Sequence, residues 1–167
     1  HARRGRSGRF DFPRPLKGRK DCNFSFSGLK TSVRETVHDL GALTDQDIAD
    51  VCAGFEAAVS DTMADRLRMA IAMFRDAHPD VERPALIIAG GVAANARLKA
   101  MFEAAAQTHG FELIVPPAKL CTDNAAMIAW AGAERLALGL IDDLGVAARA
   151  RWPLDQAQAP VYGSGKL

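Results

Sequence analysis

The sequence is poor in cysteine, and the few cysteines that it has exclude two common ways of stabilising a small fold. Cys22, Cys52 and Cys121 are odd in number and widely spaced, and no two of them form a CxxC pair. Such a set argues against both a disulfide framework and a zinc knuckle. We therefore expect a protein of the reducing cytoplasm.

Long apolar runs are also absent. The longest apolar stretches, 85–89 and 125–133, are too short or too interrupted by polar residues to cross a bilayer, so no membrane span is expected. The charged residues 1–6 are followed by neither an apolar core nor a small-residue cleavage site, which argues against a secretory signal. Because the sequence starts with His1 rather than Met, we expect further sequence upstream.

Histidines at metal-ligand spacing are missing as well. The four histidines are His1, His38, His78 and His109. They form no HxxxH or HExxH pair, the spacings that place two imidazoles on one face of a helix. A complete histidine-based metal site is therefore not expected within this chain.

What the sequence does contain is enough apolar material for one soluble domain and a strongly basic start. The chain has 167 residues, of which 49% are apolar, and this allows a sizeable core. Its net charge of +1 conceals eight Arg or Lys among residues 1–20 against one acid, Asp11. Such an arm can attract phosphate backbones through counterion release. It can equally be a solvated linker, and charge alone leaves both readings open.

Capping and periodicity predict two helices in the first half of the chain. Residues 1–21, rich in Gly, Pro and Arg, are expected to be extended, and a helix is expected over about 28–40. Thr44 and Asp47 resemble a capping box at the start of a long helix, which ends at 78–80. Apolar residues recur every three or four positions along it, which predicts one buried face.

Strands and helices alternate in the second half. A strand is expected over 85–89, where unbroken apolar character indicates burial on both faces, followed by a helix over about 94–107 and a second strand over 111–115. Thr122 or Asp123 is expected to cap a final helix. The β-α-β-α order predicts parallel strands with right-handed crossovers and hence an α/β fold.

Three parts are expected along the chain. They are a basic extended segment over 1–21, a folded lobe over 22–140 and an irregular tail over 141–167.

A glycine pair stands between the first predicted strand and the next helix. Gly90 and Gly91 occupy the place where backbone amides can approach a phosphate, although the segment is neither GxGxxG nor a Walker loop. Asn95 follows, and its amide could bridge ribose hydroxyls or a nucleobase edge. The alternatives are a plain tight turn for the glycines and an N-cap for Asn95.

A second candidate site follows the second predicted strand. The carboxyl edge of a parallel sheet is where ligands collect, so Asp123 is a candidate metal or ribose ligand. Its simpler role would be to complement the dipole of the following helix. Cys121 has no recognisable base as partner and is interpreted as a core residue.

Four stretches together resemble signature blocks of the TsaD family. They are CNFSFSGLKT at 22–31, AGGVAAN at 89–95, the stretch 116–129 with its CTDN, and GRFDFPRP at 8–15. They occur in the family's order, and the likeness covers nearly all of residues 8–139.

The resemblance implies a fold similar to the actin, sugar kinase and Hsp70 (ASKHA) superfamily, in which two lobes with RNase H-like cores hold a nucleotide in the cleft between them. This chain would be the C-terminal lobe of such a protein, and residues 22–140 would be its nucleotide-binding part. It would be helix-rich, with at least two parallel strands.

The resemblance also implies an activity and partners. Members of the family transfer threonylcarbamoyl from threonylcarbamoyl-adenylate (threonylcarbamoyl-AMP) to the N6 amine of the adenosine beside the anticodon in tRNAs that read ANN codons. By this likeness Asn95 would bind the adenylate, Gly90 and Gly91 would line the same cleft, and Asp123 would be a ligand of one divalent iron or zinc ion. The implied partners are tRNA and the subunits TsaB and TsaE.

The chain departs from the family pattern by lacking the N-terminal lobe, with its HxxxH metal ligands and Gly-rich substrate loop. The isolated chain is therefore expected to be inactive. One alternative is a glycoprotein metalloendopeptidase, but no HExxH-like element is present. Another is a non-catalytic nucleotide-binding scaffold, which would not be expected to keep the motif at 121–124. A further carbamoyltransferase or a sugar kinase-like ATPase should lack the block at 24–31.

Overall fold

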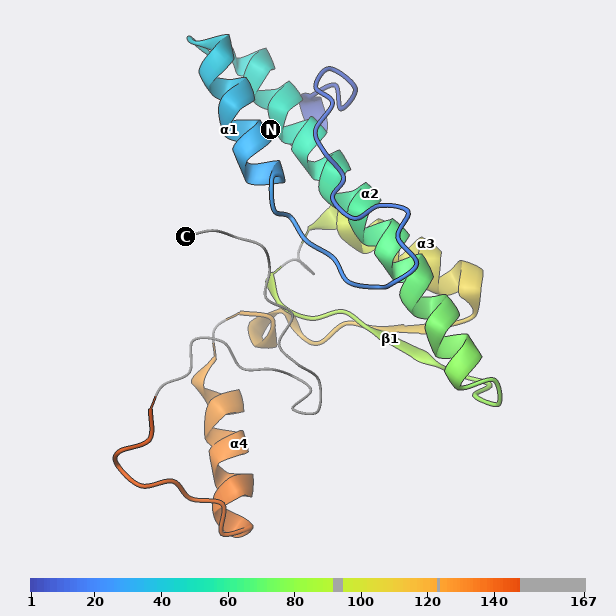
Figure 1. Ribbon diagram of the computed structural model, residues 1–167, viewed down its shortest axis with the longest axis vertical. Coiled ribbons are helices and arrows are strands. Elements are labelled where there is room, and N and C mark those ends of the chain that lie inside the picture. Colours follow the sequence, from blue (N-terminus) through green and yellow to red (C-terminus); the bar gives the residue numbers. More distant parts are fainter. Residues whose placement is uncertain (92–94, 123, 148–167) are drawn as a thin grey trace. The chain divides into compact units, whose positions relative to one another are not determined.

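A computed structural model describes residues 1–91, 95–122 and 124–147 of the chain (Figure 1). The four α-helices are α1 (Leu29–Leu40), α2 (Asp45–Ala77), α3 (Ala96–His109) and α4 (Ala125–Ala137). The strands β1 (Ala85–Ile87) and β2 (Glu112–Ile114) and the short 3-10 helices η1 (Ala2–Arg4) and η3 (Ala118–Leu120) complete the elements. Contacts divide the chain into two compact units, 1–123 and 124–167. None of the helices in the described ranges has the length and apolar character needed to cross a membrane.

The long helix α2 begins where its capping box predicts. The Thr44 hydroxyl accepts a hydrogen bond from the amide of Asp47 at 3.1 Å, and the Asp47 carboxylate accepts one from the amide of Thr44 at 2.9 Å. These bonds satisfy backbone donors that have no partner within the first turn of a helix. The helix ends at His78, before Pro79, as expected.

More than one side of α2 is buried, so the prediction of a single apolar face is incomplete. Phe55 belongs to the predicted stripe but is 43% exposed, whereas the polar side chains of Asp50, Thr62 and Arg66 are buried. The reason is that the N-terminal segment, blue in Figure 1, lies along α2 and covers these residues.

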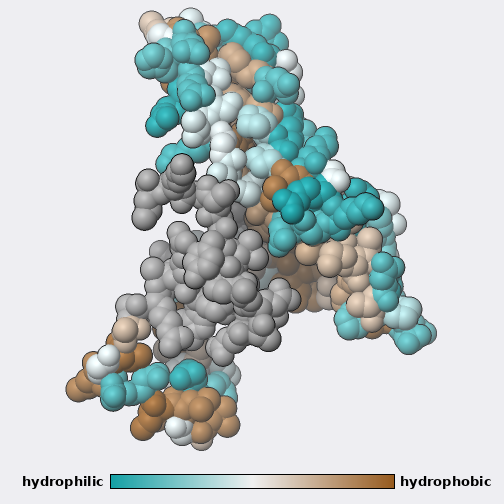
Figure 2. Space-filling view, in the orientation of Figure 1, coloured by the Kyte–Doolittle hydropathy of each residue, from teal (hydrophilic) through white to brown (hydrophobic). Residues whose placement is uncertain are grey.

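The apolar core of the first unit joins the N-terminal segment to α1 and α2. Phe12 and Leu29 are almost completely buried and cluster with Val51 and Ala58 of α2. Hydrophilic side chains cover much of the end of the molecule where α1 and the start of α2 lie (Figure 2). A buried Phe12 means that this basic segment is packed against the helix over part of its length.

Strands β1 and β2 pair in parallel, with Ala85 opposite Glu112 and Ile87 opposite Ile114. The parallel β-α-β arrangement confirms the predicted α/β class. The prediction that the first strand is buried on both faces is wrong, because Ile87 is 64% exposed. Burial on both faces requires a layer packed on each face of the sheet, and the described residues do not cover Ile87 to that extent.

Helix α3 packs on α2 through Leu98, Phe102 and Ala106, which are buried. It ends at Gly110, whose φ of 67° and ψ of 37° place it in the left-handed region that favours glycine. The predicted stop is therefore confirmed.

In the second unit, α4 begins one or two residues later than predicted. Asn124 is its N-cap, and the Asn124 side chain accepts a hydrogen bond from the amide of Met127 at 3.0 Å. The prediction of Thr122 or Asp123 as the cap is therefore wrong. Asn124 is also a strong N-cap type, and it lies one position before the helix. Over 142–147 the tail is irregular, as expected, and the rest of it lies outside the described residues.

Candidate functional site

The turn that follows β1 contains the predicted glycine pair. Gly90 has a φ of 82°, a conformation that side-chain-bearing residues rarely adopt. Gly91 has no such constraint, and a Cβ built there would meet none of the described atoms within 4 Å. Local conformation therefore explains glycine at position 90, whereas neither conformation nor packing against described residues explains it at position 91. The described residues therefore leave room for a close approach to the backbone at Gly91.

Asn95 stands at the start of α3, after residues 92–94, which lie outside the described part of the chain. Its side-chain oxygen accepts a hydrogen bond from the amide of Leu98 at 3.0 Å, so Asn95 is the N-cap of α3. Its side-chain nitrogen donates to the Glu56 carboxylate of α2 at 2.8 Å. The structural role proposed as the alternative is therefore present. Among the described residues no partner uses the other Nδ2–H or the second Oδ1 lone pair.

Sequence reasoning missed Glu56. It is half-buried on α2, next to the buried Ala57 and Ala58. Within residues 1–91, 95–122 and 124–147 it forms no ion pair, and its carboxylate accepts from Asn95, 39 positions away in sequence. The available signal was a single acid within the otherwise apolar or small stretch 51–59.

The second candidate site is described only in part. Asp123, the predicted metal ligand, lies outside the described residues. Cys121 is 8% exposed and its thiol donates to the carbonyl oxygen of Pro116 at 3.5 Å, which confirms its interpretation as a core residue. Across the described ranges, no three His, Cys, Asp or Glu side chains converge as a metal site would require. The described side chains alone therefore do not fit an iron or zinc ion.

A first anchor, the Asp50 carboxylate of α2, holds the basic start of the chain on the helix. The Asp50 carboxylate is completely buried and accepts bonds from the backbone amide of Arg6 at 2.7 Å, from the Arg6 guanidinium at 2.9 Å and from Arg9 at 3.0 Å. Gln46 donates a further bond at 2.7 Å. The bonds from Arg6, above all, hold the pKa of Asp50 well below its ordinary value.

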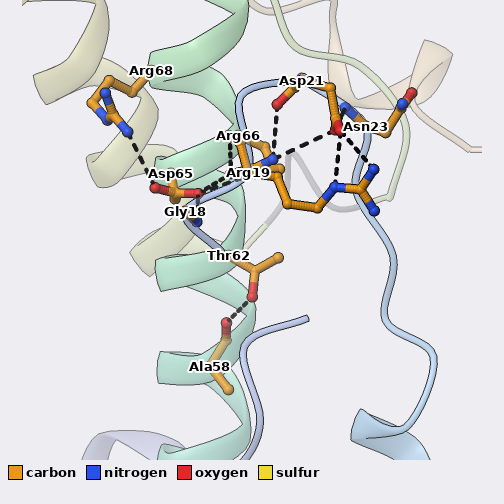
Figure 3. Close-up of polar contacts among 9 residues, drawn as sticks. All are labelled: Gly18, Arg19, Asp21, Asn23, Ala58, Thr62, Asp65, Arg66 and Arg68. Carbon is orange, nitrogen blue, oxygen red and sulfur yellow. Dashed lines mark hydrogen bonds and ion pairs between the residues drawn. The ribbon is translucent and has the colours of Figure 1, made fainter. Parts of the chain in front are cut away.

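A second anchor lies further along α2 (Figure 3). The buried Arg66 guanidinium donates to the carbonyl oxygens of Arg19, at 3.0 Å, and Asp21, at 2.8 Å, and also pairs with Asp65. Asp65 in turn accepts from the backbone amide of Gly18 at 2.9 Å. Its bond from Arg66, followed by that from Gly18, lowers the pKa of Asp65 to about 2. Residues 18–21 are thereby fixed on the helix.

Half of the basic side chains in residues 1–20 form ion pairs within the chain. Four arginines form ion pairs: Arg6, Arg9, Arg14 and Arg19. The other four basic side chains are exposed and form no ion pair with any residue that the structure describes: Arg3, Arg4, Lys17 and Lys20. The segment is thus neither a plain linker nor a wholly free basic arm.

Gly90 and Gly91 follow β1, Asn95 precedes α3, and the structure brings Glu56 of α2 to Asn95. An open backbone turn beside an oriented amide can bind a polar ligand such as a nucleotide.

Comparison with known proteins adds an independent finding. The model of the family described as TsaD, tRNA N6-adenosine threonylcarbamoyltransferase, matches residues 1–130. Curated relatives that carry the name tRNA N6-adenosine threonylcarbamoyltransferase come from Brucella anthropi, 56% identical over 165 residues, and Brucella suis, 55% identical over 165 residues. Each alignment covers 99% of this chain and 46% of the relative, so the chain spans about half the length of these proteins.

Proposed function

The chain belongs to the TsaD family, and we propose that it forms the C-terminal half of a tRNA N6-adenosine threonylcarbamoyltransferase. In the proposed reaction the N6 amine of the adenosine beside the anticodon attacks the carbamoyl carbon of threonylcarbamoyl-adenylate. A C–N bond forms, the bond from that carbon to the phosphate oxygen breaks, and AMP leaves as the amine loses a proton. The α/β architecture of the chain fits the ASKHA class to which the family belongs.

The contribution that we assign to this chain is to bind the adenylate. Neither conformation nor packing against described residues requires glycine at position 91. A close approach of the ligand to the backbone would explain it. Gly90 shapes the turn, and Asn95 presents a side-chain amide whose direction is fixed by two bonds. Binding of this kind supplies proximity and orientation, which lower the entropic part of the barrier. The observation that carries the proposal is the glycine turn after β1, followed at the start of α3 by an amide that two bonds orient.

We also propose Asp123 as one ligand of a divalent iron or zinc ion. The described side chains do not supply the other ligands. We assign these to the part of the relatives' length that this chain does not cover. When bound, such an ion can polarise a carbonyl or phosphoryl oxygen.

Partners follow from the proposed reaction and from the family. The substrate tRNA would meet the cations that form no ion pair with described residues, among them Arg3, Arg4, Lys17 and Lys20. We propose TsaB and TsaE as protein partners and the cytoplasm, where tRNA is modified, as the location.

The test uses the full-length protein that contains this chain and two substitutions of Asn95. Asn95→Ser keeps an N-cap oxygen for α3 but removes the amide, whereas Asn95→Ala removes both. If Asn95 binds substrate, both variants raise the KM for threonylcarbamoyl-adenylate in tRNA modification, and only Asn95→Ala lowers the melting temperature substantially. Normal KM in both variants, with a lower melting temperature for Asn95→Ala, would show that Asn95 is only a cap.

A further inference from the structure

Glu56 and Asn95 meet across two helices that are already packed together. The buried Leu98, Phe102 and Ala106 of α3 hold this helix against α2 by apolar contact. The bond from the Asn95 amide to Glu56 is therefore not needed to dock α3. What this bond adds is control over the direction of the Asn95 amide.

The two bonds of Asn95 have complementary roles. The amide of Leu98 must donate, so it fixes which side-chain atom of Asn95 is the oxygen. Glu56 is a carboxylate and accepts only, so it holds the nitrogen at 2.8 Å on the other side. With both ends held, the plane of the amide is set before any ligand arrives, and one Nδ2–H and one Oδ1 lone pair are left for it.

A carboxylate at position 56 carries a cost in solvation free energy that an apolar residue would not. Glu56 is half-buried and, among the described residues, has no cation nearby to form an ion pair. Burying part of a carboxylate costs solvation free energy, and an apolar side chain would fill the same place without that cost. A bond between an amide and a charged acceptor is stronger than one between neutral groups, which suits a group that must hold a partner in one orientation.

We infer that Glu56 is a positioning residue of the adenylate site: its carboxylate orients the amide of Asn95 for the substrate. This inference rests on the proposed function, in which Asn95 contacts the adenylate. Glu56 acts through Asn95, so its removal should weaken adenylate binding while leaving the chemical step intact.

The experiment compares Glu56→Gln with Glu56→Met in the full-length protein that contains this chain. The two replacements have similar length and neither is charged, but only Gln can accept the bond from Asn95. We expect Glu56→Met to raise the KM for threonylcarbamoyl-adenylate about threefold to tenfold, the equivalent of one hydrogen bond. The kcat and the KM for tRNA should stay unchanged, and Glu56→Gln should restore most of the loss. Asp76→Asn, which removes an exposed charge near the end of α2, is the control and should behave as the parent.

A double variant separates positioning from mere support of the fold. Asn95→Ser combined with Glu56→Met should bind the adenylate as Asn95→Ser alone does, because Glu56 then has no amide to orient. Additive losses, or equal losses in Glu56→Gln and Glu56→Met, would overturn the inference. If Glu56→Met does not fold, as judged by its melting curve, Glu56→Ala takes its place with the same expectations.

The inference and the proposed function can fail separately. If Asn95→Ser raises the KM while Glu56→Met does not, the positioning role of Glu56 is wrong and the adenylate site stands. If Asn95→Ser leaves the KM unchanged, the proposed role of Asn95 falls, and the role of Glu56 falls with it.

Discussion

Arg66 of α2 is buried, and its guanidinium donates to the backbone carbonyl oxygen of Asp21 at 2.8 Å, across 45 positions of sequence. Arg66 also holds the carbonyl oxygen of Arg19, so a single side chain fixes the segment that leads into the block at 22–31. A structural role for this arginine follows directly, because its charge is used entirely within the chain.

Arg66→Met should destabilise the chain by about 2–4 kcal/mol, because it leaves two carbonyl groups and the Asp65 carboxylate without their charged donor. Urea unfolding of the 167-residue chain measures this change. The matched control is Arg68→Met, since Arg68 is exposed and contacts Asp65 only at 3.4 Å. That variant should lose less than about 1 kcal/mol. Equal losses in the two variants would contradict the anchoring role of Arg66.

The stability of the chain should depend on pH through Asp65. Its pKa falls from 3.8 to about 2 on folding, so the ionised group favours the folded state above pH 3.8. That contribution is lost as the pH falls through about 2. In Asp65→Asn the decline in unfolding free energy between about pH 4 and 2 should be shallower than in the parent. An unchanged slope would show that the Asp65 carboxylate is not coupled to folding; Asp76→Asn serves as the reference for an exposed acid.

The isolated 167-residue chain should transfer no threonylcarbamoyl group to tRNA. Its described residues supply no metal site, and the chain spans only about half the length of the relatives that it matches. The assay supplies threonylcarbamoyl-adenylate and tRNA to the purified chain and measures modified adenosine. Turnover above the protein-free background would disprove this expectation, and the full-length protein is the positive control.

Gly90 and Gly91 should respond differently to substitution. Gly90→Ala places a side chain at a φ of 82° and should lower stability by about 1–2 kcal/mol. A Cβ at position 91 would meet none of the described atoms within 4 Å. Gly91→Val should therefore leave the melting temperature nearly unchanged while it weakens binding of the adenylate. Titration of an adenylate analogue into the full-length protein, with parallel melting curves, tests both. Combined with Asn95→Ala, Gly91→Val should cause no further loss of affinity, because the ligand is already displaced.

Asp123→Ala in the full-length protein should abolish retention of iron or zinc, because a divalent ion of this kind depends on each of its few ligands. Elemental analysis of the purified variant gives the metal content. Loss of an acid just before a helix should cost only about 0.5–2 kcal/mol of stability, so the fold should persist. Full metal content in a folded variant would remove Asp123 from the ligand set.

Features set by neighbouring residues could be predicted from the sequence. The Thr44–Asp47 capping box and the stop at Gly110 involve atoms within a few positions of each other, and both are confirmed. The start of α4 was misplaced because Thr122, Asp123 and Asn124 are three consecutive cap-forming residues. Local preference cannot decide among such neighbours.

Features set by distant residues could not be predicted. Asp50 meets Arg6 across 44 positions and Glu56 meets Asn95 across 39, and no periodic pattern connects such pairs. Burial of the first strand was overestimated for a related reason. Whether Ile87 is covered depends on which elements pack on each face of the sheet, and the described residues leave it exposed.

The two anchors on α2 also set a fixed length for the segment between them. Asp50 and Arg66 are 16 positions apart, which is about 24 Å along a helix. The chain from Arg6 to Asp21 must span that distance in parallel with α2. A deletion between Arg9 and Arg14 would strain these contacts, because Arg9 pairs with Asp50 and Arg14 pairs with Asp61, roughly 16 Å further along α2, which five residues span only when nearly extended. An added residue in the turn before Thr44 would leave both anchors in place. Evolutionary gain and loss of residues should therefore be rarer within 6–21 than in that turn.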